Sequence, residues 1–240
     1  MKNVVRMLLI LLTASSYSQA QISHQIGLES LLSIDHVKVL NSESIFRNSG
    51  QLKAGIGFQY QMDITEHLHI QSGLGYKAYS TATHAFFPEN TFQVIKTFPS
   101  FDVIQVPIGV YYVCDPAKTR FHIGFRGGYQ LGTQVLHELN TTFVSSKREG
   151  NVVLLGTDVT GSSPMTQQVY LGTQVDYLKL DPLIISLDLS HYHGFQSMMT
   201  ATIEPSVNGV RMISEHFESV GSYTRWGITV SRKIGGEGKS

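Results

Sequence analysis

The chain has 240 residues, 18 basic and 18 acidic side chains, one cysteine and a mean hydropathy of −0.01. A formal net charge of zero argues against a nucleic-acid binder, which carries a basic excess. The 42% content of hydrophobic residues argues against a disordered chain, and a single cysteine rules out a disulfide-stapled scaffold.

The first twenty residues predict a secretory signal peptide. Lys2 and Arg6 form a basic start, residues 7–12 are wholly apolar, and residues 18–20 read Ser-Gln-Ala, a cleavage site with small flanking residues. The apolar run is far shorter than the ~20 residues of a membrane-spanning helix. We therefore expect residues 1–20 to be removed, which leaves 16 basic against 18 acidic side chains. In an oxidising compartment the lone Cys114 then has no internal disulfide partner.

Alternation with a period of two begins directly after this segment. Residues 22–34 predict the first strand. Residues 52–64 place Leu, Ala, Ile, Phe, Tyr, Met and Ile on one face and Lys, Gly, Gly, Gln, Gln and Asp on the other. Residues 67–78 repeat the scheme after a short connection at Thr65 and Glu66. This pattern is typical of strands with one apolar face.

Five more segments alternate in the same way and predict strands at 104–112, 121–131, 169–177, 183–195 and 223–234. Short turns with proline, at 115–118 and at Asp181-Pro182, join two pairs of them.

The connections fall into a short set and a long set. The long set covers approximately 41–50, 82–101, 137–165 and 197–221. Eight strands with short turns at one end and long loops at the other predict an all-β fold, an eight-stranded antiparallel up-and-down transmembrane β-barrel over residues 21–234. Each strand is close to the ~9–11 residues needed to cross a bilayer at a tilt.

Alternation alone does not say which face lies inside, because a soluble barrel such as a lipocalin alternates too. The polar face is rich in glycine, with Gly55, Gly57, Gly73 and Gly75 as examples. Glycine weakens a strand that faces solvent but suits the narrow interior of an eight-stranded barrel. We therefore expect the apolar face to lie in lipid, in the outer membrane of a Gram-negative cell, with the long loops outside.

The two faces supply two sets of candidate site residues. Charged side chains aimed at the lumen are Glu29, Lys53, Lys77, Arg126, Asp176, Asp188 and Arg225. Candidates for aromatic girdles on the apolar face are Tyr60, Tyr76, Tyr112, Tyr129, Tyr177 and Trp226. Both signs of charge are present in near balance, so we expect the lumen charges to cross-link the strands through an interior that side chains fill.

Three segments, 106–112, 121–129 and 191–195, resemble the PorT-like outer-membrane β-barrel proteins. The first two, with the turn at 115–118, look like the central hairpin of that family, and His-Tyr-His-Gly-Phe at 191–195 resembles the end of its penultimate strand. The resemblance implies the barrel architecture. The name-giving member takes part in a protein secretion system, a role that we do not transfer. The family usually closes on an aromatic residue near the C-terminus, whereas here a polar tail, 235–240, follows the last strand.

Two pairs of histidines raise the question of a metal site. His67 and His69, and likewise His191 and His193, are spaced to place two imidazoles on one side of a strand. Zinc takes three or four ligands, and no third ligand stands at a helpful spacing. We therefore expect no metal and no cofactor.

An enzymatic alternative resembles the outer-membrane lipid A deacylases. His191 or His193 would act as the base and Ser190 or Ser197 as the nucleophile. The deacylases place a serine two residues after the histidine, and this chain does not. A second alternative is a secreted soluble barrel that binds a small ligand.

The long loops are the remaining candidates for function. The loop at 137–165 contains the apolar run 152–155, and the loop at 197–221 holds Val210 and Ile213 among polar residues. Their alternation predicts hairpins that extend the barrel above the membrane, and the same apolar residues are candidates for docking a partner.

The sequence therefore predicts a monomeric, non-enzymatic barrel with a structural or binding role, and one specific form of that role is an accessory of an envelope or secretion complex. Its expected partners are outer-membrane lipid and a protein at the extracellular loops or periplasmic turns, with no nucleic acid.

Overall fold

A computed structural model describes most of the chain after residue 22. The described residues are 23–36, 38–40, 46–50, 52–79, 81–87, 92–97, 101–114, 122–135, 142–148, 151–161, 163–180 and 182–234. The predicted signal peptide, the turn at 115–118 and the tail at 235–240 lie outside these ranges. Within the described ranges, no helix has the length and apolar character of a membrane span.

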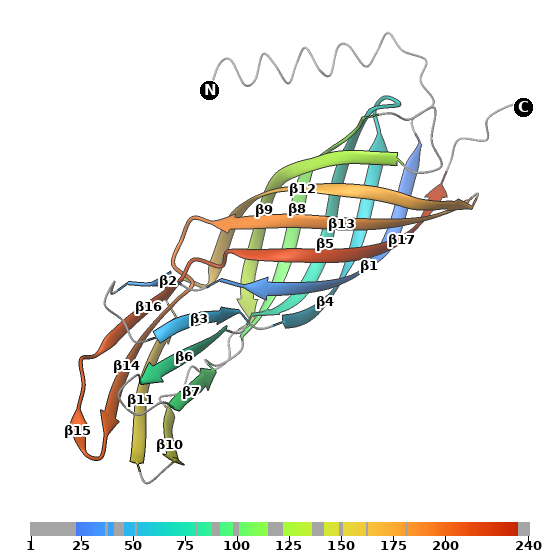
Figure 1. Ribbon diagram of the computed structural model, residues 1–240. Helices are drawn as coiled ribbons and strands as arrows, with labels where there is room; N and C mark the ends of the chain where they lie inside the picture. Colours follow the sequence, from blue (N-terminus) through green and yellow to red (C-terminus); the bar gives the residue numbers. More distant parts are fainter. Residues whose placement is uncertain are drawn as a thin grey trace, which may run out of the picture.

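Eight long strands close into a barrel (Figure 1). They are β1 (His24–Asp35), β4 (Leu52–Asp63), β5 (Leu68–Tyr79), β8 (Phe101–Val113), β9 (His122–Val135), β12 (Met165–Leu180), β13 (Leu183–Gly194) and β17 (Tyr223–Ile234). Their order around the barrel is β1-β17-β13-β12-β9-β8-β5-β4, and all neighbours are antiparallel, including the closing pair β1 and β17. The predicted eight-stranded up-and-down barrel is confirmed.

The two ends of the barrel differ. At one end, here called the turn end, short turns join β4 to β5, β8 to β9 and β12 to β13, and β1 begins and β17 ends there. The β4–β5 turn is held by Thr65, whose Oγ1 accepts hydrogen bonds from the backbone N–H groups of His67 and Leu68 at 3.2 and 2.9 Å. The other end is called the loop end.

The segments predicted as long loops contain further strands. They are β2 (Lys38–Val39), β3 (Phe46–Gly50), β6 (Thr81–Phe87), β7 (Phe92–Thr97), β10 (Thr142–Arg148), β11 (Asn151–Gly161), β14 (Met199–Val207), β15 (Val210–Arg211) and β16 (Glu215–Ser219). Together they form an extension beyond the loop end (Figure 1).

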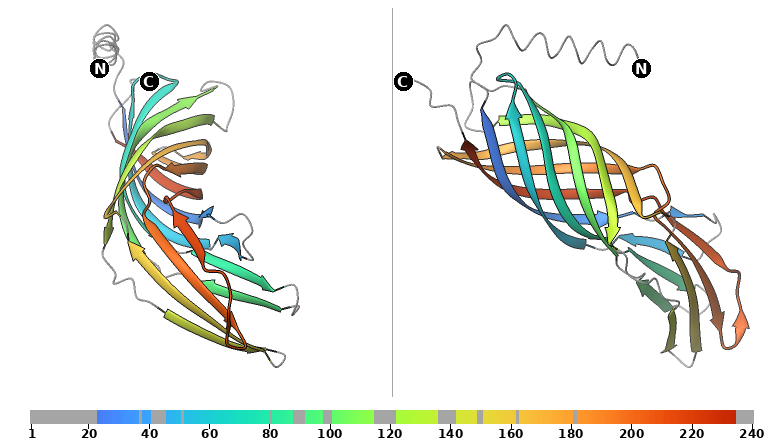
Figure 2. Two further views of the ribbon diagram at one scale, coloured as in Figure 1. Left: turned by 90° about the vertical axis from the view of Figure 1, so that its left-hand side faces the viewer. Right: turned by 180° about the vertical axis from the view of Figure 1, so that it is seen from behind.

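The extension continues the barrel wall. One sheet runs β10-β11-β14-β16-β2, with β15 paired to β14, and a second runs β3-β6-β7. Apart from β15, which lies between β14 and β16, each extension strand is adjacent along the chain to one barrel strand, and the order of the extension strands repeats the order of those barrel strands. Among the described residues no backbone pairing joins β7 to β10 or β2 to β3, so the extension is split into two half-shells (Figure 2).

The barrel and the described side chains of the extension differ in which strand face is polar. On β13 the buried side chains are Ser186, Asp188, Ser190 and Tyr192, while Leu187 and Leu189 face outward. The outward face of the barrel is apolar on the other barrel strands too, as the exposed fractions of 72% for Leu171 and 60% for Ile56 show. The barrel therefore has a polar interior and an apolar exterior.

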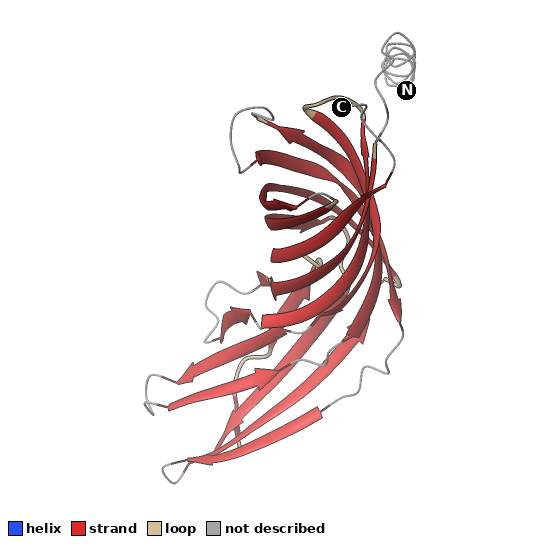
Figure 3. Ribbon diagram, turned by 90° about the vertical axis from the view of Figure 1, so that its right-hand side faces the viewer, coloured by secondary structure: helices blue, strands red, loops and turns tan. Residues whose placement is uncertain are grey.

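The extension strands β11, β14 and β16 are arranged the other way round. Their buried positions include Leu155, Val159, Ile203 and Phe217, which belong to one hydrophobic cluster. The alternate residues on β11 and β14, such as Asp158, Thr160, Thr200 and Glu204, are exposed. Strands make up most of the described part of the chain (Figure 3), and the polarity of the described strand faces reverses at the loop end of the barrel.

Candidate functional site

The middle of the lumen holds a buried ion cluster, defined by Glu29, Arg126, Asp188 and Arg225. Arg225 Nη2 lies 2.9 Å from Glu29 Oε1 and 2.9 Å from Asp188 Oδ1, and Arg126 Nη1 lies 3.4 Å from Asp188 Oδ1. All four side chains are buried, and their formal charges cancel. The cluster joins β1, β9, β13 and β17 across the interior, as ion pairs do when each partner compensates the other for lost hydration.

A glycine makes room for this cluster. Gly227 lies opposite Asp188 in the β13–β17 register, and a Cβ added at Gly227 would overlap Asp188 Oδ2 and lie 3.2 Å from Glu29 Oε1. The glycine-rich inner face that the sequence predicted is thus used here to fit two carboxylates beside a strand.

Nearer the loop end, a lysine is held between aromatic rings. Lys77, which is fully buried, forms a salt bridge with Asp35, and its Nζ lies 3.5 Å from the ring centroid of Tyr79 and 3.6 Å from that of Tyr223. Tyr223 stacks on Tyr192 with centroids 4.4 Å apart. We call this set the lysine–tyrosine plug.

Tyr170 extends the plug, because its ring stacks on Tyr192 with centroids 5.0 Å apart. The cation–π contacts of Lys77 replace part of the hydration that its ammonium group loses.

Amide side chains fill the space around the plug. Tyr79 Oη accepts hydrogen bonds from Gln105 Nε2 and Gln168 Nε2 at 3.0 and 2.9 Å, and Gln130 Nε2 donates to Tyr223 Oη at 3.1 Å. Because amides both donate and accept, they satisfy the buried hydroxyl groups of Tyr79 and Tyr223 without adding charge.

A second amide layer lies toward the turn end. Gln71 Nε2 donates to Gln61 Oε1 at 2.9 Å and to Gln174 Oε1 at 3.1 Å. Asp176 belongs to this layer rather than to the ion cluster, since its Oδ1 accepts hydrogen bonds from Gln174 Nε2 and Ser186 Oγ. A small cavity between Gln71 and the ion cluster has room for about one water molecule.

The predicted lumen charges therefore occupy different environments. Glu29, Arg126, Asp188 and Arg225 form the ion cluster, and Lys77 lies in the plug. Asp176 is buried among amides. Lys53 is only partly buried, and the structure gives it no salt bridge to another described residue.

The predicted girdle residues are all on the outward side of the barrel. Tyr60, Tyr112 and Tyr177 lie near the turn ends of their strands, whereas Tyr76 and Trp226 lie near the loop ends. Tyr129 lies midway along β9, where its Oη donates a hydrogen bond to Gln167 Oε1 at 2.6 Å.

Sequence reasoning missed Asp35 and the inward tyrosines. Asp35 stands one residue beyond the predicted end of the first strand, and Tyr79 one residue beyond the predicted end of the third. Tyr192 and Tyr223 were covered by predicted strands at inward positions, in step with Asp188 and Arg225. Extending the alternation by one residue at those two strand ends would have placed Asp35 and Tyr79 inside the lumen.

The first histidine pair does not share a face, contrary to the prediction. His67 lies in the turn before β5, where its Nδ1 is 2.8 Å from the carbonyl oxygen of Val113. His69 points inward, and its Nδ1 is 2.7 Å from Asp63 Oδ1. The pair separates because His67 precedes the strand, so strand alternation does not apply to it. Among the described residues no three metal-binding side chains are grouped together.

The second histidine pair points away from the lumen. His191 and His193 are exposed on the outer side of β13, whereas Ser190 is buried inside, with its Oγ 3.4 Å from Asp188 Oδ1. Ser190 and either histidine therefore lie on opposite faces of one strand, which removes the proposed dyad that used Ser190.

Comparisons with known proteins give the fold. No family model and no curated protein matches the chain. Among solved structures, the outer membrane protein OprG from Pseudomonas aeruginosa is similar over 90% of this chain and 98% of OprG, with a TM-score of 0.55 and 9% sequence identity. At this identity OprG shares the eight-stranded outer-membrane barrel fold, while the resemblance to PorT-like proteins stays a prediction.

Two further structures match with lower scores. Ail, the attachment invasion locus protein of Yersinia pestis, has a TM-score of 0.41 at 8% identity over 89% of this chain and 99% of Ail. The outer membrane protease OmpT from Escherichia coli has a TM-score of 0.41 at 10% identity over 91% of this chain and 98% of OmpT.

Proposed function

We propose that this protein is an outer-membrane barrel with a closed lumen that displays a rigid β-sheet extension outside the cell as a binding surface. The reversal of polarity at the loop end carries the proposal. Apolar side chains face outward along the barrel strands and inward on the extension strands β11, β14 and β16. One chain satisfies both patterns when lipid surrounds the barrel and water surrounds the extension.

The dimensions of the barrel fit a bilayer. Strands such as β4 and β13 have 12 residues. At a tilt of about 40° such a strand rises about 30 Å along the barrel axis, close to the thickness of the hydrocarbon core. In water the outward face would be an apolar surface far larger than soluble monomers tolerate, which argues against the secreted soluble barrel.

The filled lumen supports a role other than transport. The ion cluster, the lysine–tyrosine plug and the amide layers leave only small internal cavities among the described residues. An eight-stranded barrel has an interior just wide enough for side chains. The separation of Ser190 from the outward histidines supports the non-enzymatic form of the proposal.

The far tip of the extension offers the surface for a protein partner. Asn208 and Gly209, with φ of 51° and 81°, form a tight hairpin turn after β14. Beyond it Val210 and Ile213 are 69% and 75% exposed, and Met212 is exposed as well. We call Val210, Met212 and Ile213 the apolar tip, and we assign it to binding a protein of the cell envelope, as an accessory of an envelope or secretion complex.

A planar-bilayer experiment tests the closed lumen. Protein that has been refolded, and whose heat-modifiable migration on a gel shows a folded barrel, is inserted into the bilayer. We expect almost no ionic current, because no continuous water path crosses the plug. Steady openings of large conductance would overturn the closed-lumen proposal.

Substitution of the apolar tip tests its binding role. The double variant Val210→Ser, Ile213→Ser should keep the barrel but lose the envelope proteins that co-purify with the wild-type protein after cross-linking on cells. Thr200→Ser, on the polar outer face of β14, is the control and should retain them. An unchanged set of cross-linked proteins in the double variant would contradict the assignment.

A further inference from the structure

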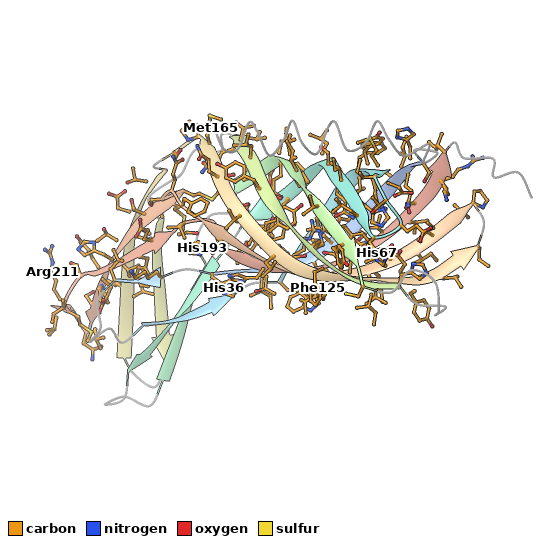
Figure 4. The ribbon with its side chains drawn as sticks, turned by 90° about the horizontal axis from the view of Figure 1, so that it is seen from above. His36, His67, Phe125, Met165, His193 and Arg211 are labelled. Atoms are coloured by element: carbon orange, nitrogen blue, oxygen red, sulfur yellow. The ribbon has the colours of Figure 1, made fainter. Side chains whose placement is uncertain are left out.

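Three outward-facing side chains meet where the barrel joins the extension. They are His36, which follows β1, Thr224 on β17 and His191 on β13, and we call them the rim patch. Thr224 pairs with His191 in the β13–β17 register and with Ile34 in the β1–β17 register. The patch thus crosses three adjacent strands, and the label of His36 in Figure 4 marks its place between barrel and extension.

The rim patch lies directly above the apolar face of the barrel. Trp226 is two residues from Thr224 on the same side of β17, and it pairs with Leu32 on β1 and Leu189 on β13, both of which are exposed. Tryptophan favours the boundary between hydrocarbon and headgroups. The rim patch therefore falls at headgroup level if the barrel spans the membrane as proposed above.

One hydroxyl group serves both imidazoles. Thr224 Oγ1 lies 3.1 Å from His36 Nε2 and 3.2 Å from His191 Nδ1, and the centroids of the two rings are 5.8 Å apart. A hydroxyl has one proton to donate and two lone pairs to accept with. With both rings neutral, one ring donates to Thr224 and the other accepts from it. The nitrogens on the far side of the rings then present one donor and one acceptor.

Protonation of the two imidazole rings changes the number of hydrogen-bond donors in the rim patch. When both rings are imidazolium, each donates to Thr224 Oγ1, which accepts twice and turns its own proton outward. The far nitrogens of His36 and His191 both become donors. Two positive charges then lie on rings whose centroids are 5.8 Å apart, and their N–H groups are donors of the kind that binds the oxygens of a phosphate group.

We propose that the rim patch binds the phosphate monoester of an outer-leaflet lipid headgroup, and that it does so more tightly at acidic pH. The inference rests on the proposed membrane location of the barrel. The apolar side chains beneath the patch supply the contact for the acyl chains, which a free anion would not use.

The surroundings of His36 set the pH range. Burial lowers the pKa of His36, and the nearby His191 and Lys77 lower it further, while Asp35 opposes them. A lowered pKa keeps His36 neutral at pH 7, so His36 gains its positive charge only as the pH falls. Further along the same faces, Lys38 on β2 is paired in register with Glu218 on β16, so these two charges offset each other. Bound phosphate favours the protonated rings, and its binding takes up protons.

The single tryptophan of the chain provides the readout. Protein in zwitterionic micelles is titrated with a short-chain phosphatidic acid, and the fluorescence of Trp226 is followed at pH 8.0 and at pH 5.5. We expect binding that is tighter by about tenfold at the lower pH. The double variant His36→Gln, His191→Gln keeps hydrogen-bonding side chains that cannot be protonated, and it should lose the tighter binding at the lower pH.

Matched controls separate the alternatives. His24→Gln removes an outward histidine at the turn end, where His24 Nδ1 is 2.7 Å from Tyr60 Oη, and it should behave like the wild type. Phosphatidylcholine of the same chain length should give no pH-dependent response.

Three outcomes would overturn the assignment. An equal response to inorganic phosphate alone would mean that the patch takes a free anion rather than a lipid. Retention of the pH effect in the double variant would mean that other groups carry it. A folded, heat-modifiable barrel that shows no response to phosphatidic acid would refute the lipid site and leave the proposed function standing, whereas failure to insert into membranes would count against the proposed function.

Discussion

At the scale of single residues, the interior depends on where side chains are absent. Gly227 and Gly75 are both barrel glycines, yet their surroundings differ. A Cβ at Gly227 would overlap the carboxylate of Asp188, whereas at Gly75 the nearest atoms, those of Gln105, lie 3.9 Å away. The absence of a side chain is therefore needed at Gly227, where it makes room for a carboxylate, but not at Gly75, where a methyl group would fit.

Gly227→Ala should destabilise the barrel by about 1–3 kcal/mol, because the added methyl group forces Asp188 away from Arg225. Gly75→Ala is the matched control and should change the free energy of unfolding by less than about 0.5 kcal/mol. Urea unfolding in micelles, followed by the fluorescence of Trp226, measures both. Equal effects of the two substitutions would mean that the ion cluster does not depend on the space at Gly227.

The sequence predicted which residues face the lumen. It did not predict which other side chains those residues contact. Alternation alone assigned Glu29 and Asp188 to the interior, because side-chain direction in a strand is local. It did not separate Asp176, among amides, from the ion cluster, because contacts across a barrel depend on register and on distances between strands far apart in the chain. The tyrosine stack was missed for the same reason.

At the scale of elements, the closing pair of strands is β1 and β17, the first and the last. Arg225 on β17 contacts Glu29 on β1 and Asp188 on β13, so one side chain ties the closing pair to its neighbour. Arg225 and Glu29 are separated by 196 positions in the chain. Closure thus combines a long backbone ladder with a buried charge contact.

Arg225→Met should lower the free energy of unfolding by about 3–5 kcal/mol, since it leaves two buried carboxylates with only Arg126. Adding Glu29→Gln removes one negative charge, restores neutrality and should recover part of the loss. The comparison is a double-mutant cycle read by urea unfolding. Strictly additive effects of the two substitutions would show that Arg225 and Glu29 are not coupled.

Strand boundaries show where the alternation pattern holds and where it fails. The last strand was predicted at 223–234, and β17 has those bounds. The strand predicted at 169–177 runs further, as β12, because the β12–β13 register shifts between Asp176 and Leu178 and breaks the period of two. The extension was harder to predict, because its apolar face points inward and its hairpins pair with strands that are distant in sequence.

At the scale of the whole molecule, the proposed function implies an orientation in the membrane. The turn end would face the periplasm, and the apolar tip would face the outside. Cys114, the single cysteine, is exposed at the turn end of β8 and offers a natural label.

A membrane-impermeant maleimide should therefore label Cys114 only after the outer membrane of cells is permeabilised. The variant Cys114→Ser, Ile213→Cys should be labelled on intact cells, because Ile213 lies in the apolar tip and is exposed. Mass shift of the protein on a gel measures both. Labelling of Cys114 on intact cells would reverse the proposed orientation.

The continuity of wall and extension also has a mechanical consequence. The arms that lead to the apolar tip, β14 and β16, continue β13 and β17, so a partner that pulls on the tip along the barrel axis loads these antiparallel ladders lengthwise. Under such shear many backbone hydrogen bonds must break together, whereas peeling would break them one at a time. The extension is therefore suited to carrying tension from a bound partner into the membrane, as a tether would.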